Sequence, residues 1–293
     1  MWIEKYINYL RYEKNYSSHT EISYFKDLSQ FQEFVEDKVG CFDIKTVDAD
    51  LIRTWISLLM EEGLKATTVN RKLSSVKSFF KYLQKMELVH INPAVYIKGP
   101  RPERKLPNFV NHADMLEVLS MASYTENFEG VRDHFLIELL YVTGMRREEV
   151  ISLRDCDVDV ESDTLKVRGK GNKERLIPIS ERTKSHLLDY INIRNKEIKN
   201  RTPYLFVRKS GKKLYERMVY SIVNKHLSSV KTLSIKSPHV LRHSFATAML
   251  NSGAEINAVK SLLGHASLSS TQIYMHVTFK ELKKVYNNAH PRA

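Results

Sequence analysis

Basic, imidazole and phenolic side chains in the second half of the chain have the composition needed for chemistry on a phosphodiester. The set comprises Arg146 in TGMRREEV, Lys170 in RGKGNKERL, His239 and Arg242 in PHVLRHSFAT, His265 in LLGHASL and Tyr274 in TQIYMHV. Attack by a phenol on phosphorus adds negative charge to the non-bridging oxygens. Guanidinium groups suit that charge because each donates a bidentate fork. The residue types therefore indicate nucleophilic attack by Tyr274 on a phosphate ester.

The other members of this set answer the weaknesses of a phenol as a nucleophile. A phenol with a pKa near 10 is only about 0.1% ionised at pH 7, a shortfall of roughly 4 kcal/mol. His239 or His265 can accept its proton, and each arginine can contribute on the order of 3 kcal/mol to the transition state. Lys170 is the candidate general acid for the leaving sugar oxygen. The reaction stores its energy in a phosphotyrosine bond, so we expect neither a cofactor nor a metal.

Each of these residues, taken alone, also has an ordinary structural interpretation. Arg146 can simply pair with Glu149 three residues later, and Lys170 can be a solvated turn lysine. His239 with Arg242 can be polar groups at a helix start, and Tyr274 can be a packed aromatic. Only the combination, with its flanking residues, indicates a catalytic site.

The local sequence predicts how these side chains are positioned. A helix over 131–143 ends at Gly144, which places Arg146 in the turn that opens the next helix. Strands over 155–160, 164–168 and 174–179 are predicted, and the last two flank the hairpin loop GKGNK with Lys170 at its tip. Ser237 and Pro238 begin a helix that runs to Gly253, with His239 and Arg242 on one face of its first turn.

Two further helices are predicted after this one. A helix over 255–263 stops at Gly264 immediately before His265, and a short helix then carries Tyr274. A basic helix at the end of the chain follows it.

Length and charge indicate two domains and a polyanionic partner. The chain has 293 residues, which is long for a single hydrophobic core, so we expect two domains. Its formal net charge of +12 favours a polyanionic partner. Residues 1–100 hold 14 basic and 13 acidic side chains, whereas residues 101–293 hold 32 and 21. We therefore place the main phosphate-binding surface in the second part.

The first part reads as a helical domain over 1–97 that a linker over 98–108 joins to a domain over 109–293. The apolar stripe of helix 67–83 consists of Val69, Leu73, Val76, Phe80 and Leu83. Its opposite face carries Thr67, Arg71, Ser74 and Lys81, which either contact DNA or are merely solvated. The proline-rich linker carries Arg101, Arg104 and Lys105, which we expect to lie along phosphates.

Cysteine usage and hydropathy set further limits. The two cysteines, Cys41 and Cys156, form neither a disulfide framework nor a zinc-binding spacing. The N-terminal segment is charged throughout, and the most apolar run, FLIELLYV, is too short to cross a bilayer. We expect a soluble, cytoplasmic protein.

The chain resembles the tyrosine recombinase (phage integrase) family, and within it the Xer recombinases. The strings that carry the resemblance are LLYVTGMRREEVISL, VRGKGNKERLIPI, SPHVLRHSFATAMLNSG and LLGHASLSSTQIYMHV. All six positions of the family's catalytic set are filled, and Glu149 is implied as the residue that orients Arg146. The segments TTVNRKLSSVKSFFKYL and INPA look like the family's core-binding domain.

The resemblance implies a mainly α fold with a small antiparallel β-sheet. An all-helical, SAM-like core-binding domain precedes a mixed catalytic domain, and the two clamp double-stranded DNA. Four protomers join two recombination sites, Tyr274 becomes linked to a 3′ phosphate, and a Holliday junction forms. Whether the tetramer is homomeric or heteromeric, and whether a DNA translocase takes part, stays open. So does the choice among chromosome dimer resolution, integration of a mobile element and inversion.

Three other functions remain as alternatives. A type IB topoisomerase-like enzyme uses similar chemistry on one strand, and a non-catalytic DNA-binding regulator keeps only the fold. A metal-dependent nuclease is suggested by the acidic run Asp155, Asp157, Asp159, Glu161 and Asp163. These residues alternate with Cys156, Val158 and Val160, so we interpret the run as one face of a half-buried strand.

Overall fold

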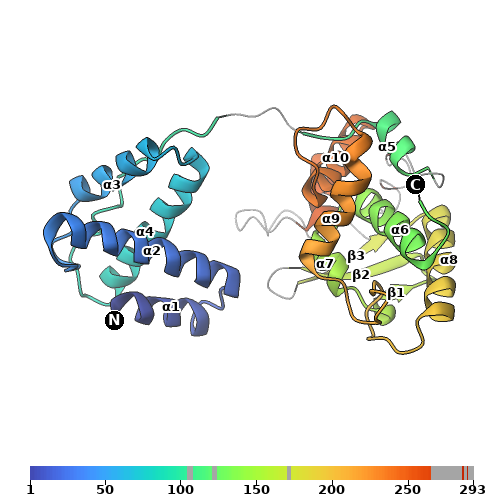
Figure 1. The fold of residues 1–293 in the computed structure, drawn as a ribbon, viewed down its shortest axis with the longest axis horizontal. Helices are drawn as coiled ribbons and strands as arrows, with labels where there is room; N and C mark the ends of the chain where they lie inside the picture. The colour runs from blue at the N-terminus through green and yellow to red at the C-terminus, as the bar shows by residue number, and fades with distance from the viewer. Residues whose placement is uncertain (104–107, 121–123, 170–172, 265–285, 287–288, 290–293) are drawn as a thin grey trace. The chain divides into compact units, whose positions relative to one another are not determined.

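The chain folds into two compact units, Met1–Leu106 and Pro107–Ala293 (Figure 1). In this computed structural model the described residues are 1–103, 108–120, 124–169, 173–264, 286 and 289. The first unit contains the described residues 98–103 of the predicted linker. The amide of Asn70 donates to the carbonyl oxygen of Pro100 at 2.8 Å, so the chain stays attached to its helix up to that point. Each unit is described by itself.

The described part of the first unit is built from α-helices. They are α1 (Trp2–Tyr12), α2 (Ser18–Val39), α3 (Ala49–Glu61) and α4 (Ala66–Lys85). Ser17 and Asp48 cap α2 and α3 with their side chains, and Gly40 ends α2 with a φ of 85°. The helix predicted over 67–83 is therefore confirmed, within two residues of the observed ends of α4.

The core of the first unit is aromatic and centres on α4. All five residues of the predicted stripe of α4 are buried. Phe31 of α2 packs on Trp55 of α3 with ring centroids 4.9 Å apart. The buried Lys72 of α4 pairs with Asp27 of α2 at 3.3 Å and lies 6.0 Å from the ring centroid of Trp55. The burial of one stripe leaves the opposite face of α4 exposed.

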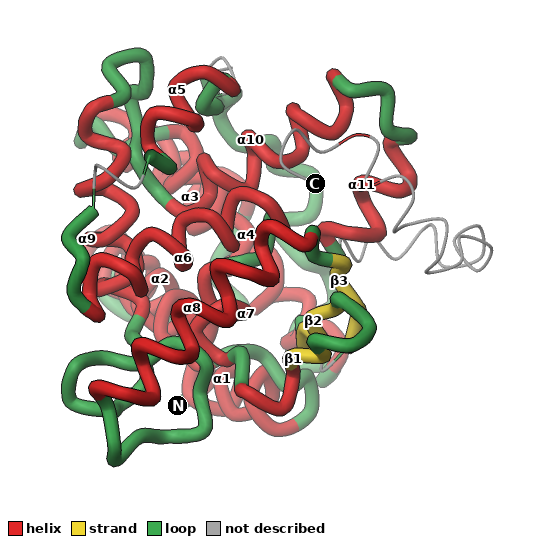
Figure 2. The backbone as a smooth tube through the Cα atoms, turned by 90° about the vertical axis from the view of Figure 1, so that its right-hand side faces the viewer, coloured by secondary structure: helices red, strands yellow, loops and turns green. Residues whose placement is uncertain are grey.

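The second unit combines helices with one small sheet (Figures 1 and 2). Its helices are α5 (His112–Val118), α6 (Phe128–Thr143), α7 (Arg147–Ser152), α8 (Glu181–Glu197), α9 (Glu216–His226), α10 (Pro238–Asn251) and α11 (Ile256–Leu263). Strands β1 (Val158–Asp159), β2 (Thr164–Arg168) and β3 (Glu174–Pro178) form an antiparallel sheet in the order β1-β2-β3. The predicted fold class, mainly α with a small antiparallel sheet, is confirmed.

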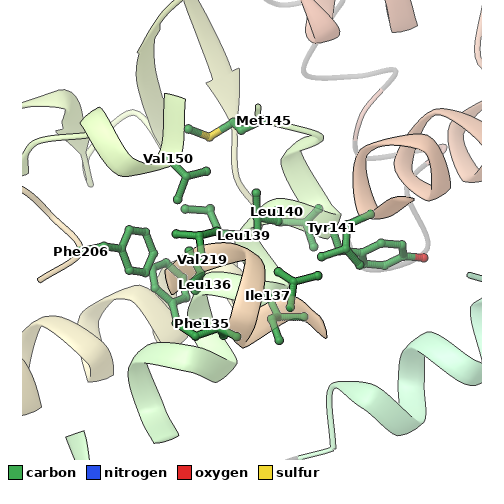
Figure 3. Packing of buried hydrophobic residues seen from close by; sticks show 14 of the residues in the cluster. Phe135, Leu136, Ile137, Leu139, Leu140, Tyr141, Met145, Val150, Phe206 and Val219 are labelled. Atoms are coloured by element: carbon green, nitrogen blue, oxygen red, sulfur yellow. The ribbon is translucent and has the colours of Figure 1, made fainter. Parts of the chain in front are cut away.

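Helix α6 runs through the core of the second unit and is buried on all sides (Figure 3). Its contacts are mainly with α8 and α10. Phe135 of α6, Tyr190 of α8 and Phe206 stack on one another with centroid distances of 5.3 to 5.7 Å. A helix held this firmly fixes its C-terminal end, where the candidate site begins. Among the described residues, no helix combines the length and the apolar character needed to cross a bilayer.

The strand predicted over 155–160 is wrong for most of its length. Asp155–Asp157 form a short 3-10 helix, and β1 has only two residues. Asp155 lies 2.7 Å from both Arg194 and Arg201, and the Asp157 carboxylate accepts from the backbone N–H of Arg154 at 2.9 Å. Ion pairs to distant arginines and a local cap, and not alternation across a pleat, explain these acidic residues.

Candidate active site

Arg146 is positioned by the turn that ends α6. Gly144 has a φ of 59°, and a Cβ there would lie 2.5 Å from Cδ1 of Phe245 and 2.8 Å from Cδ2 of Leu263. Only glycine adopts this positive φ without strain and has no Cβ to clash with Phe245 and Leu263. The chain then reverses so that Arg146 becomes the N-cap of α7. The exposed fraction of its side chain is 35%, so the guanidinium is held against the protein and still accessible.

Arg242 and His239 come from the first two turns of α10. Pro238 begins this helix, as the sequence predicted, and residues three apart lie on the same side. The Arg242 guanidinium donates to the carbonyl oxygens of Gly144 at 2.6 Å and Leu263 at 2.7 Å. His239 is exposed beside it. The end of α6 and the end of α11 therefore orient this guanidinium together.

A third arginine, Arg175 of β3, completes the arrangement, and sequence reasoning did not identify it. The carbonyl oxygens of three consecutive residues at the end of α11 each accept from a different guanidinium. Leu262 accepts from Arg175 at 2.8 Å, Leu263 from Arg242 at 2.7 Å and Gly264 from Arg146 at 3.1 Å. The last carbonyls of a helix lack partners within it and carry partial negative charge, so cations suit them.

Glu149 joins two of these arginines through its carboxylate. Arg146 donates to Oε1 at 2.9 Å from its side chain and to Oε2 at 2.7 Å from its backbone N–H. Arg175 donates to Oε1 at 2.9 Å and to Oε2 at 2.8 Å. Burial alone would raise the pKa of the Glu149 carboxyl, but the hydrogen bonds and charges of Arg175 and Arg146 outweigh it and lower that pKa. Glu149 is therefore an anion that holds two cations in place.

We call Arg146, Arg175, Arg242 and Glu149 the arginine cluster. Burial, followed by repulsion from Arg146, lowers the pKa of Arg242 to about 10, and Glu149 partly offsets the shift. At neutral pH the guanidinium keeps its proton. The three cations and one anion of this cluster leave an excess of positive charge in partly buried surroundings, which favours binding of an anionic group.

Three of the six predicted catalytic residues, Lys170, His265 and Tyr274, lie outside the described residues. Two of their neighbours are described. A Cβ on Gly169 would lie 3.5 Å from Oε1 of Glu149, so the residue before Lys170 lies beside the arginine cluster. Gly264, the residue before His265, accepts from Arg146 as noted above.

The alternation of side chains along β3 is the one sequence feature that could have pointed to Arg175. It pairs with Val167 across the sheet and is two residues from the buried Ile177, so it occupies the core face of β3. A basic residue at such a position requires an anionic partner, because an unpaired buried charge is costly. The partner, Glu149, lies 26 residues earlier in the chain, beyond the reach of local patterns.

The candidate DNA-binding residues of α4 are exposed, namely Thr67, Arg71, Ser74 and Lys81. Arg71 is also ion-paired with Asp27 and hydrogen-bonded to Ser23 at 2.6 Å, so part of its guanidinium is engaged within the unit. Arg101 is exposed, whereas Arg104 and Lys105 of the predicted linker lie outside the described residues.

Comparison with known proteins identifies the family. The model of the phage integrase family matches residues 108–281, and that of the phage integrase N-terminal SAM-like domain matches residues 3–87. The chain belongs to the phage integrase family. Its membership, with the relatives described next, makes it a site-specific recombinase of the tyrosine type.

Curated relatives of the family match along the whole chain. The tyrosine recombinase XerC of Chlorobaculum tepidum is 36% identical, in an alignment that covers 100% of this chain and 95% of the relative. The tyrosine recombinase XerC of Staphylococcus saprophyticus is 38% identical, covering 99% of this chain and 97% of the relative. The expected resemblance to Xer recombinases is therefore confirmed.

Solved structures of the family share the fold. A post-cleavage complex of the XerH site-specific recombinase with a palindromic difH substrate has a TM-score of 0.74 and 24% identity, over 96% of this chain and 82% of that one. The Tn1549 transposon integrase in complex with transposon right end DNA has a TM-score of 0.73 and 22% identity, over 97% of each chain.

Proposed function

We propose that the chain binds a double-stranded DNA recombination site and exchanges strands through a covalent bond between Tyr274 and a DNA 3′ phosphate. The observation that carries this proposal is the arginine cluster. Consecutive carbonyls at the end of α11 accept hydrogen bonds from Arg146 and Arg242 and so hold both guanidiniums in place. Preorganised donors stabilise developing charge without having to rearrange during the reaction.

In the proposed reaction the Tyr274 oxygen forms a bond to phosphorus, and the bond from phosphorus to the 5′ oxygen breaks. The phenolic proton passes to His239 or His265, and Lys170 protonates the departing 5′ oxygen. Arg146 and Arg242 neutralise the charge on the non-bridging oxygens. The reverse reaction, with a 5′ hydroxyl from another strand as nucleophile, rejoins the DNA and releases Tyr274.

The proposal assigns different parts of the DNA to the two units. The second unit holds the scissile phosphate, and the first unit, through Thr67, Arg71, Ser74 and Lys81, contacts DNA beside it. Arg101, Arg104 and Lys105 lie along the backbone between these contacts. The domain roles follow the two family models, one for each unit. Because Arg71 is already paired with Asp27, we expect Lys81 to contribute more to binding.

We further propose a Xer-like assembly in the cytoplasm, where four protomers act on two sites through a Holliday junction. The XerC relatives that match the whole chain support this choice.

The nucleophile is tested on a nicked suicide substrate, which traps the covalent adduct because the short cleaved strand diffuses away. Tyr274→Phe is expected to keep DNA binding and to form no adduct, since the ring lacks the attacking oxygen. Tyr220→Phe, a partly exposed tyrosine on α9, is the matched control and should form adduct as the unaltered protein does. An adduct with Tyr274→Phe would contradict the assignment. Relaxation of supercoiled DNA without recombinant products would favour a topoisomerase-like reaction.

A further inference from the structure

We propose that Arg175 is a positioning residue that fixes Arg146 in its catalytic orientation through the shared carboxylate of Glu149. The inference rests on the proposed function, since it assigns a role within the same site. Arg175 is on β3, whereas Arg146 opens α7 and the Leu262 carbonyl belongs to α11. One guanidinium therefore joins the sheet to both elements that orient Arg146.

The first support is the geometry of the Glu149 carboxylate. Arg175 contacts both of its oxygens through two parallel hydrogen bonds, the bidentate arrangement that fixes a carboxylate plane. Arg146 uses the same two oxygens, one with its side chain and one with its backbone N–H. The orientation of the carboxylate thus sets the orientation of the Arg146 guanidinium.

The second support is the end of α11. The Nε of Arg175 donates to the carbonyl of Leu262, two residues before the Gly264 carbonyl that accepts from Arg146. A Cβ on Gly264 would lie 3.1 Å from Nη1 of Arg175 and 3.3 Å from its Cδ, so the guanidinium packs closely on this peptide. Arg175 therefore fixes Arg146 by two routes, the carboxylate and the carbonyl.

The third support is the accessibility of the side chains. The exposed fraction of the Arg175 side chain is 14%, compared with 35% for Arg146. Arg175, the less exposed of the two, donates its hydrogen bonds to Glu149 and to the Leu262 carbonyl. The more exposed one stays accessible to a phosphate. We therefore assign Arg175 to positioning and Arg146 to contact with the substrate.

The decisive variant is Arg175→Lys, which keeps the charge and removes the fork. A lysine cannot contact both oxygens of Glu149 and the Leu262 carbonyl in the same plane. Single-turnover adduct formation on the nicked substrate is expected to slow by about 10²-fold, the scale of a displaced catalytic group. The dissociation constant for the DNA site and the Tm are expected to stay close to those of the unaltered protein.

The matched control is Arg168→Lys. Arg168 belongs to the same sheet, but its side chain pairs with Glu174 at 3.0 Å, not with Glu149. This variant is expected to form adduct at the unaltered rate. If Arg168→Lys slows adduct formation as much as Arg175→Lys, the effect comes from the sheet as a whole and the proposal fails.

Two further measurements separate positioning of Arg146 from other effects. With a sulfur at the bridging 5′ position, which needs little protonation to leave, the defect of Arg175→Lys is expected to persist. Loss of the defect would mean that Arg175 serves the general acid Lys170 instead. Glu149→Gln combined with Arg175→Lys is expected to slow cleavage less than the product of the two single effects. If the double variant slows cleavage by the full product of the two single effects, Glu149 does not link Arg175 to Arg146 and the proposal fails.

Failure of this inference is distinguishable from failure of the proposed function. An Arg175→Lys protein that forms adduct at the unaltered rate, while Tyr274→Phe forms none, removes only the role of Arg175. Adduct formation by Tyr274→Phe removes the nucleophile itself.

Discussion

The second unit buries two glutamates in opposite ways. Glu149 of α7 is 4% exposed and lies among arginines, which stay charged at every physiological pH. Glu138 of α6 is 0% exposed and lies among histidines. Its Oε2 is 2.5 Å from Nδ1 of His186, and its Oε1 has no hydrogen-bond partner among the described residues. We call Glu138, His134, His186 and His226 the histidine cluster.

Ring contacts as well as carboxylates hold the histidine cluster, since His226 also lies 3.9 Å from Asp133. Tyr124 stacks on His226 with centroids 4.3 Å apart and meets the edge of His134 at 4.9 Å. The donor atoms of His134, Glu138 and His186 lie within 4.8 Å of one another. Two ligands of one tetrahedral zinc ion stand about 3.3 Å apart, wider than the 2.5 Å between His186 and Glu138. A hydrogen bond fits that distance better than a shared metal.

The two clusters differ in the kind of cation that surrounds the buried glutamate. The three guanidinium groups of the arginine cluster, at which a phosphate is proposed to bind, keep their charge near neutral pH. The three imidazoles of the histidine cluster are charged only when protonated, and we expect their protonation to alter stability more than catalysis. The following tests compare the two clusters directly.

The largest difference is expected from removing each carboxylate charge. Glu149→Gln leaves the guanidiniums of Arg146 and Arg175 without their carboxylate partner, so we expect cleavage to slow by about 10²-fold and the free energy of unfolding to fall by about 3 kcal/mol. Glu138→Gln keeps an acceptor for His186 and removes a buried charge. It should leave cleavage unchanged and alter stability by at most about 1 kcal/mol. Adduct kinetics and urea unfolding measure both, and equal effects would erase the distinction.

A smaller effect is expected on acid stability, first from the histidine cluster. Burial, with Lys225 and His134, lowers the pKa of His226 to about 4 from its ordinary 6.5. Between these values the unfolded chain binds the extra proton, so stability falls as the pH falls from 6.5 towards 4. The full shift corresponds to about 3 kcal/mol, which solvent screening reduces to about 1 kcal/mol.

The arginine cluster is expected to respond only at lower pH. The lowered pKa of Glu149 gives stability that is present above its ordinary 4.5 and is lost as the pH falls through the folded-state value. His226→Asn should flatten the decline between pH 6.5 and 4, whereas His243→Asn, at an exposed position, should not. Urea unfolding across this range measures which cluster loses stability first. If His226→Asn leaves the slope of the unfolding free energy against pH unchanged, the assignment to His226 is contradicted.

The smallest effect is expected from chelation. Because the spacing of His186 and Glu138 suits a hydrogen bond, EDTA should leave both the Tm and adduct formation unchanged. A Tm that falls on chelation and recovers with zinc would instead assign a metal to the histidine cluster. The variant His186→Ala, which removes one donor, would then abolish the recovery.

Local signals predicted the helix ends that build the site. Gly144 and Gly264 end helices with positive φ, as the sequence indicated, and Ser237 with Pro238 begins α10. These features depend on residues adjacent in sequence, such as a glycine that tolerates a left-handed backbone. Such rules work wherever the cause is local.

Contacts between distant segments could not be predicted in the same way. Asp155 lies in a 3-10 helix because Arg194 and Arg201 reach it from much later in the chain. Arg175 was overlooked because its partners, Glu149 and Leu262, are 26 and 87 residues away. The alternation of acidic and apolar residues from Asp155 to Asp163 suggested a strand. The ion pairs of Asp155 with residues far along the chain favour a 3-10 helix at its start instead.

The peptide groups at 262–264 form a latch shared by three arginines. The chain passes directly from this latch to His265 and then to Tyr274. A displacement of the backbone at 262–264 would therefore move the guanidiniums of Arg175, Arg242 and Arg146 together. The alignment of all three cations depends on one short stretch of chain.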